Sequence, residues 1–184
     1  MANNKVKYGL KNVHYAVATI DEQTNTATYG PVKPWVGAVN LSQEAQGETT
    51  KFRADNIDYW VGNSNNGYSG DFESALIPES FRKDVLNEIE DSNGVLVEDA
   101  GAKTVHFALM FQFEGDENAT KYVLYNCKMS RPDIESSTTE DGIEVQTVSG
   151  EITASPRAFD NIVKSQCAST ASTAYTNWFT TVQD

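Results

Sequence analysis

The sequence contains few of the side chains on which enzymes most often depend. It has two histidines and two cysteines in 184 residues. His14 and His106 each lie among small residues on the less apolar side of an expected strand, so we interpret both as structural or interface residues. The serine elbow of hydrolases and the glycine-rich loops that bind phosphates or dinucleotides do not occur in the sequence. The chain therefore offers no positive support for an enzyme, and we expect no catalytic residues.

The two cysteines do not form a metal site by their spacing. Cys127 falls among the apolar residues of an expected strand and is interpreted as a core residue, and Cys167 follows 40 positions later. The first ten residues, MANNKVKYGL, lack an apolar segment, so we expect no secretion signal, and hence free thiols. No apolar run approaches the length that crosses a bilayer, and membrane insertion is not expected.

Basic side chains are scarce relative to acidic ones. Fourteen Lys and Arg residues stand against 26 Asp and Glu residues, which gives a formal net charge of −12. Nucleic-acid binding by phosphate neutralisation needs clustered basic residues, and the sequence has no such cluster. Nothing selects a catalytic pair among the carboxylates, and Asp116 with Glu117 lacks the ligand pattern of a calcium loop. We expect no metal, no cofactor and a surface that repels DNA.

The strongest pattern that is present is the alternation of β-strands. Residues 104–113, TVHFALMFQF, place every second residue from Val105 to Phe113 on an apolar face. Residues 121–129 place Val123, Tyr125, Cys127 and Met129 on one face, and the polar turn 114–119 between the two segments predicts a hairpin. Strands are also predicted at 11–20, 48–54 and 142–154, the last with a bulge near Gly150.

One helix is predicted among these strands, over about residues 79–90. Phe81, Val85, Leu86 and Ile89 share one face of that helix. We therefore expect a mainly β fold, a β-sandwich or small barrel with one flanking α-helix and extended loop and terminal arms. The expected domain spans residues 1–157, with a long hairpin at about 40–77. Residues 158–184 form either a C-terminal arm or the last structural element.

Two aromatic segments are candidate binding surfaces. The stretch 55–76, DNIDYWVGNSNNGYSGDFESAL, sets rings in a glycine- and asparagine-rich frame, and a second group of rings lies near the end of the chain. A carbohydrate- or receptor-binding module would expose such rings to a ligand, whereas an assembly subunit would bury them against a copy of itself. The candidate inter-subunit residues are Tyr59, Trp60, Tyr68, Phe72, Tyr175, Trp178 and Phe179.

The order of several segments resembles the major tail protein, or tail tube protein, of long-tailed bacteriophages of the siphovirus type. The landmarks are YGLKNVHY (8–15), YW (59–60), NGYSG (66–70), the helix, NGVLVE (93–98), FALMF (107–111), YVLYNC (122–127), RP (131–132) and EIT (151–153). The similarity covers roughly residues 8–157, and residues after Arg157 match only loosely.

The resemblance implies a structural virion protein without catalytic residues or cofactor. Its copies would form hexameric rings that stack into the tail tube, which conducts the genome to the host. The implied partners are further copies of the chain, a tape measure protein inside the tube, and tail terminator and distal tail proteins at its ends. DNA would pass transiently without sticking, which an acidic lumen favours. The implied location is the virion tail, after assembly in the host bacterial cytoplasm.

Overall fold

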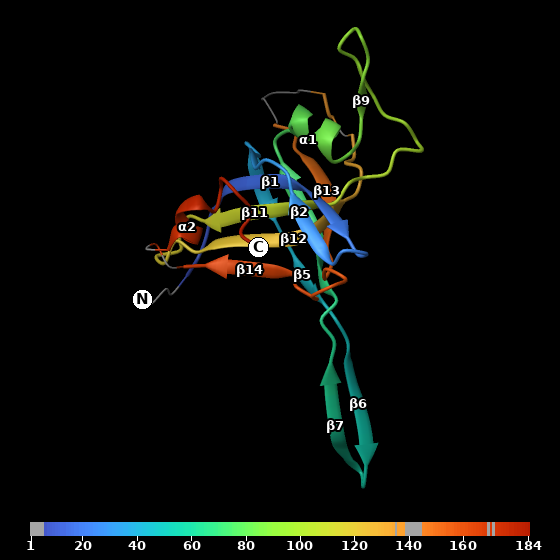
Figure 1. Ribbon diagram of the computed structural model, residues 1–184, viewed down its shortest axis with the longest axis vertical. Coiled ribbons are helices and arrows are strands. Elements are labelled where there is room, and N and C mark those ends of the chain that lie inside the picture. Colours follow the sequence, from blue (N-terminus) through green and yellow to red (C-terminus); the bar gives the residue numbers. More distant parts are fainter. Residues whose placement is uncertain (1–5, 135, 139–144, 169, 171) are drawn as a thin grey trace.

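The computed structural model describes residues 6–134, 136–138, 145–168, 170 and 172–184, and its fold is mainly β, as the sequence predicted (Figure 1). The strands of the main sheet are β1 (Leu10–Asp21), β2 (Thr26–Tyr29), β3 (Lys33–Pro34), β4 (Ala38–Leu41), β5 (Glu44–Gln46), β8 (Gly67–Ser74), β11 (Phe107–Phe113), β12 (Lys121–Met129), β13 (Val148–Ala154) and β14 (Lys164–Cys167). Two separate strand pairs are β6 (Thr49–Ala54) with β7 (Ile57–Asn63), and β9 (Ile89–Glu90) with β10 (Leu96–Val97).

The main sheet is antiparallel and curls toward a barrel. Its order is β2-β1-β11-β12-β13-β8-β4, with β3 beside β1, β5 beside β8 and β14 beside β12. The first residues of β12 pair with β14 and its last residues with β13, so the sheet divides along this strand. Strand β4, at one end of the order, also approaches β1 near the other end. The sandwich or small-barrel class predicted from the sequence is confirmed.

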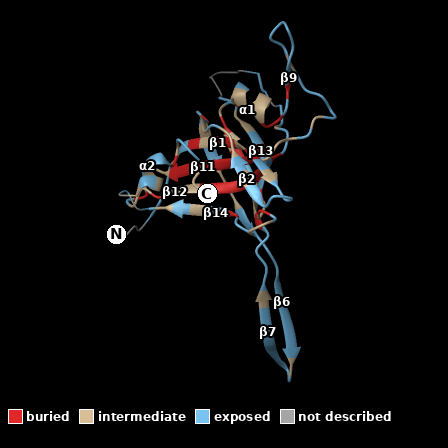
Figure 2. Cartoon of the chain, in the orientation of Figure 1, coloured by how far each residue is buried: buried red, intermediate tan, exposed pale blue. Residues whose placement is uncertain are grey.

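A cluster of aromatic rings fills the interior of this curled sheet. Helix α1 (Glu79–Asp84) directs Phe81 inward, where its ring centroid lies 5.0 Å from Tyr15, 4.3 Å from Trp35 and 5.2 Å from Phe107. The contacts with Tyr15 and Phe107 are edge-to-face, the geometry that the ring quadrupoles favour. Figure 2 shows the buried residues concentrated in this body. The cluster therefore joins the helix to β1 and β11.

The helix is shorter than the predicted span of 79–90. Phe81, Val85 and Leu86 are buried, as its apolar face required, but the helix ends at Asp84 with Val85 as its C-cap. Asn87 has φ of 60°, a left-handed conformation that asparagine tolerates at helix ends, and Ile89 is exposed in β9. A second short helix, α2 (Thr173–Asn177), was not identified from the sequence. Its N-cap Ser172 accepts a hydrogen bond from the backbone of Tyr175.

The central strands are buried on both faces. On β11, Phe107 and Leu109 face the interior, as predicted, while Ala108 and Met110 join a second apolar cluster that also contains Trp178. The prediction of one common face on β12 is wrong. A register shift between β11 and β12 puts Val123 and Tyr125 in the second cluster and Cys127 and Met129 in the first.

Strand β13 is shorter and more regular than predicted. It begins at Val148, residues 145–147 precede it outside any strand, and the first residues of the predicted strand, 142–144, lie outside the described residues. The predicted bulge near Gly150 is wrong, because β13 pairs with β8 in continuous register and Gly150 faces Phe72. A Cβ at Gly150 would lie 2.5 Å from Cε of Met129. The glycine therefore accommodates a close side chain.

Replacing Phe81 by Ala is expected to lower the free energy of unfolding by about 3–5 kcal/mol, because it leaves a cavity among rings that cannot collapse to fill it. The measurement is chemical denaturation of purified protein. The matched control is Phe52→Ala, the same substitution at a side chain that is 59% exposed, with an expected change within about 0.5 kcal/mol. Equal losses in both variants would contradict this description of the core.

His106 is expected to make stability sensitive to mild acid. Burial lowers the pKa of His106, although its Nδ1 lies 2.5 Å from Oδ1 of Asn126. The unfolded chain therefore takes up a proton at higher pH than the folded chain, so stability is full above the unfolded pKa of about 6.5 and falls as the pH drops below it. Between about pH 7 and pH 5, the melting temperature of the natural chain should fall more than that of His106→Gln. Parallel profiles would contradict the prediction.

Candidate assembly interface

The β6–β7 hairpin projects from the body of the protein (Figure 1), and nearly all of its side chains are exposed (Figure 2). Its turn is formed by Asp55 and Asn56, with φ of 53° and 64° between the paired residues Ala54 and Ile57. Two successive left-handed residues define the tight turn that matches strand twist, and Asp and Asn adopt this conformation most readily after glycine. The sequence of the turn therefore builds a straight hairpin that needs no contact with the body.

The two faces of the hairpin differ in chemistry. Phe52 pairs with Trp60, and cross-strand partners share a face of the sheet. The register then shifts at Tyr59, so Asp58 faces the other side, where its carboxylate lies 2.9 Å from Nζ of Lys51 and 3.4 Å from Nε of Arg53. One face is therefore aromatic and the other carries an ion-pair network.

The Trp60 ring lies along the hairpin because Gly62 has no side chain in its way. A Cβ at Gly62 would lie 2.2 Å from Cη2 of Trp60, so the indole ring lies over the space that a side chain at position 62 would occupy. The ring is nonetheless 56% exposed, and Tyr59 beside it is 68% exposed. Large apolar rings that face solvent together are typical of a binding surface. These two predicted site residues are accessible in the free chain.

The next two predicted contact residues, Tyr68 and Phe72, lie at the base of the hairpin and differ in burial. Tyr68 is half-buried at the start of β8, with Nζ of Lys164 4.5 Å from its ring centroid. Phe72 is fully buried, 4.8 Å from the ring of Trp35. Phe72 therefore belongs to the chain's own core and is not available to a neighbour, which corrects its assignment as a contact residue.

The C-terminal rings also pack on their own chain. Trp178 is buried in the second apolar cluster, and its indole N–H donates to the carbonyl oxygen of Tyr122 at 3.3 Å. The Tyr175 hydroxyl donates to the carbonyl of Ala119 at 2.9 Å, and Phe179 stacks on His14 at 4.7 Å. The predicted anchor to a neighbour is thus, for Trp178, an anchor to the chain's own sheet. Tyr175 and Phe179 remain partly accessible beside it.

A buried arginine, Arg157, holds the end of the C-terminal segment. The sequence did not identify this residue as important. The guanidinium of Arg157 donates to the side chains of Asp160 and Asp184 and to the Tyr29 hydroxyl, and the side chain is 2% exposed. Burial lowers the pKa of Arg157, but the hydrogen bonds to Asp160 and Asp184 outweigh it and hold the pKa above its usual value. A charged contact 27 positions apart leaves no periodic signal in the sequence.

Other kinds of site find no support in the described part of the chain. Within those residues, no three His, Cys, Asp or Glu side chains gather in an arrangement that could hold a metal ion. No helix among them is long and apolar enough to span a membrane. The candidate functional surface is the pair of exposed rings on the hairpin, Tyr59 and Trp60.

Comparison with known proteins gives only distant similarities. No protein-family model matches the chain, and no curated protein matches it. One similar solved structure is the tube-terminating cap of the anti-feeding prophage, with a TM-score of 0.48 and 11% identity over 91% of this chain and 97% of that chain. Another is the anti-feeding prophage baseplate, 6-fold symmetrised, with a TM-score of 0.47 and 10% identity over the same shares. Similarity at this level does not assign a function.

Replacing Gly62 by Val is expected to displace the Trp60 ring without unfolding the body. Trp60 is the exposed member of the three tryptophans, because Trp35 and Trp178 are each 3% exposed. Acrylamide quenching of fluorescence therefore reports mainly on Trp60, and quenching should increase in the variant. The control is Thr50→Val at the cross-strand position. Unchanged quenching in Gly62→Val would show that the ring does not rest over Gly62.

Proposed function

We propose that this chain is a self-assembling structural protein of a phage-type tail, and specifically a subunit of the tail tube. The observation that carries the proposal is the projecting hairpin, whose exposed Tyr59 and Trp60 rings are covered by no other part of the described chain. Such rings are the residues that most often dominate protein interfaces. The resemblance of the sequence landmarks to tail tube proteins gives the same assignment.

Open strand edges support assembly with further copies. In the described chain, β2 and β4 end the main sheet, and the outer edges of β6 and β7 carry no further strand. Exposed edges pair readily with other strands, and a closed ring of subunits is one way to remove them. Such contacts would be heterologous, and hexameric rings that stack into a tube follow from the resemblance.

The outward face of β8 and β13 suits the lumen of such a tube. Asp71 lies directly opposite Glu151 across these strands, and Glu73 and Glu44 belong to the same sheet region. Among the described residues none of these four carboxylates forms an ion pair with Lys or Arg. Like charges directly opposite each other destabilise a sheet. We propose that this face turns toward the passing genome and repels its phosphates.

The remaining partners belong to the same proposal. A tape measure protein would occupy the lumen, and terminator and distal tail proteins would close the two ends of the tube. The virion tail would be the site of action, after assembly in the cytoplasm of the host. These partners follow from the resemblance in the sequence and from the self-association that the exposed hairpin supports.

The test compares Tyr59→Ala and Trp60→Ala with the natural chain by negative-stain microscopy and mass measurement in solution. The natural chain should form rings or tubes, while both variants should remain folded monomers at the same concentration. A buried aromatic anchor contributes about 2 kcal/mol or more at an interface, equivalent to at least tenfold in association.

The matched control is Tyr8→Ala, because Tyr8 is 66% exposed but lies outside the hairpin. Normal tubes from both hairpin variants, or a natural chain that stays monomeric at high concentration, would overturn the proposal. Binding of glycans by the monomer, lost in Tyr59→Ala and Trp60→Ala, would instead support a carbohydrate-binding module.

A further inference from the structure

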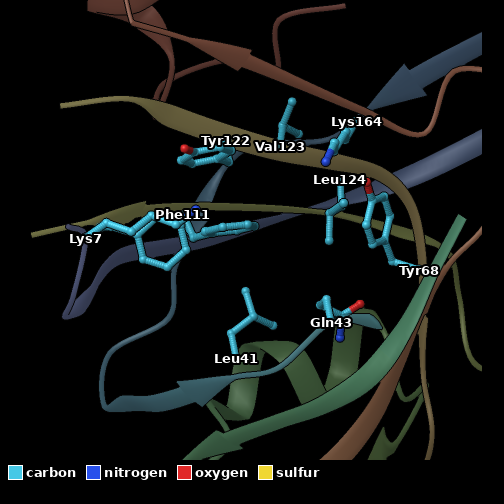
Figure 3. A pocket seen from close by; sticks show the side chains of 10 residues that line it. Lys7, Leu41, Gln43, Tyr68, Phe111, Tyr122, Val123, Leu124 and Lys164 are labelled. Atoms are coloured by element: carbon cyan, nitrogen blue, oxygen red, sulfur yellow. The ribbon is translucent and has the colours of Figure 1, made fainter. Parts of the chain in front are cut away.

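A small apolar pocket lies at the base of the hairpin. It opens between β11–β12 on one side and the β4–β5 connection with β8 on the other (Figure 3). Its volume is about 220 Å³. Small-molecule sites usually measure about 300–1,000 Å³, so this pocket is suited to a protein side chain rather than to a cofactor. Its apolar walls are formed by Leu41, Tyr68, Phe111, Phe113, Tyr122 and Leu124.

Two lysines flank the pocket, and each places its ammonium group over an aromatic ring of the pocket wall. Nζ of Lys7 lies 4.7 Å from the ring centroid of Phe113, and Nζ of Lys164 lies 4.5 Å from that of Tyr68. Within the described part of the chain neither lysine lies within 4.0 Å of a carboxylate oxygen, although Lys7 is near enough to Asp116 to contribute to the lowered pKa of that carboxyl. The aromatic faces hold the two ammonium groups at the rim. The rim is therefore a locally positive site on an acidic protein.

The pocket also contains an acceptor that has no donor. Oε1 of Gln43 is buried and has no hydrogen-bond partner in the described chain. An unsatisfied buried acceptor destabilises the free protein, and a rotation of the Gln43 amide toward the pocket would let a ligand N–H or O–H group satisfy it. The pocket thus specifies its occupant: an aromatic side chain that carries a donor, with a carboxylate close to it.

The tip of the hairpin carries this combination of groups. Asp58, Tyr59 and Trp60 are consecutive, and Asp55 lies in the turn before them. No acceptor among the described residues binds the Tyr59 hydroxyl, and Asp55 forms no ion pair there. Tyr59 is also the residue at the register shift, and it is more exposed than Trp60, whose ring lies over Gly62.

The hairpin cannot reach the pocket of its own chain. Gln43 and Tyr68, which line the pocket, lie next to β5 and in β8, where the hairpin begins, and the strands then run away from the body (Figure 1). Tyr59 lies level with Phe52 and Arg53, and the six extended residues from Gly47 to Phe52 span about 20 Å. Tyr59 is therefore held at about that distance from its own pocket, and a second copy must supply the occupant.

We propose that this pocket is the socket for the hairpin tip of a second copy of the chain, with Tyr59 inserted between the aromatic walls and its hydroxyl donating to Oε1 of Gln43. The carboxylate of Asp55 then faces Lys7 and Lys164, because Asp58 is already paired with Lys51 and Arg53. The proposal rests on the self-association proposed above and identifies the partner surface of the hairpin. A tip-to-base contact is heterologous, so it repeats from copy to copy with a spacing set by the length of the hairpin.

The first test is a double-mutant cycle on the concentration needed for tube formation. Tyr59→Phe removes only the donor and leaves Gln43 unsatisfied, so the required concentration should rise roughly tenfold. Gln43→Met removes the acceptor and leaves the hydroxyl buried without a partner. The combination Tyr59→Phe with Gln43→Met should return to within about threefold of the natural chain, because both polar groups are gone. Additive effects of the two substitutions would overturn the proposed contact.

The charges of the rim provide a second test. The pair Lys7→Glu and Lys164→Glu should raise the required concentration about tenfold or more. The matched control is Lys103→Glu with Lys128→Glu, the same change in net charge at exposed lysines outside the pocket. Equal behaviour of the two pairs would show that the rim lysines have no specific role.

Cross-linking decides whether the tip occupies this pocket. In a Cys167→Ser background, which keeps Tyr59 and Gln43, a chain with both Asp55→Cys and Lys164→Cys should form a ladder of covalent multimers on oxidation. A mixture of two chains that each carry one of these substitutions should stop at dimers of one chain of each kind, because the remaining Cys127 is buried. Tubes of the double variant that give no ladder would overturn the socket while leaving the proposed function intact. A natural chain that never associates would overturn both.

Discussion

The fold depends on a requirement that both faces of the central strands be covered. Strands β1, β11 and β12 carry apolar residues on each side, and a single chain must supply two covering layers for them. The curled half of the sheet and Phe81 of α1 cover one side. Trp178, held in place by the segment that ends at the Arg157 contacts, covers the other. The β6–β7 hairpin belongs to neither covering layer.

This division explains why the aromatic residues of the chain have two roles. Tyr15, Trp35, Phe72, Phe81 and Trp178 stabilise the single chain, because each is nearly inaccessible to solvent. Tyr59 and Trp60 stabilise nothing in the single chain beyond the hairpin itself, yet exposing them has an unfavourable hydration free energy. Residues of the first kind determine whether the protein folds. We infer that residues of the second kind determine what the folded protein associates with.

The sequence predicted those parts of the fold that depend on local periodicity. The alternation at 104–113 and 11–20 places the correct residues inside, and the start of α1 follows from Phe81, Val85 and Leu86. It could not predict the register shift that separates Tyr125 from Cys127, because a shift arises from the partner strand. The sequence also could not predict which aromatic rings are exposed. Phe72 and Tyr59 lie in one aromatic stretch, and only the pairing of β8 with β13 shows that Phe72 points into the core. The pocket joins Lys7, Gln43 and Lys164, which are distant in sequence and follow no motif.

The separation of the hairpin tip from the pocket at its base has a consequence for how an assembly would grow. A chain of copies joined tip to base has polarity, with a row of empty pockets at one end and a row of bare tips at the other. The two ends would differ in charge as well as in shape, because the pocket rim carries lysines and the turn carries Asp55. A protein that stops growth at one end could not serve at the other. Length control in such a tube would therefore need two different terminating partners, each shaped like only half of the subunit.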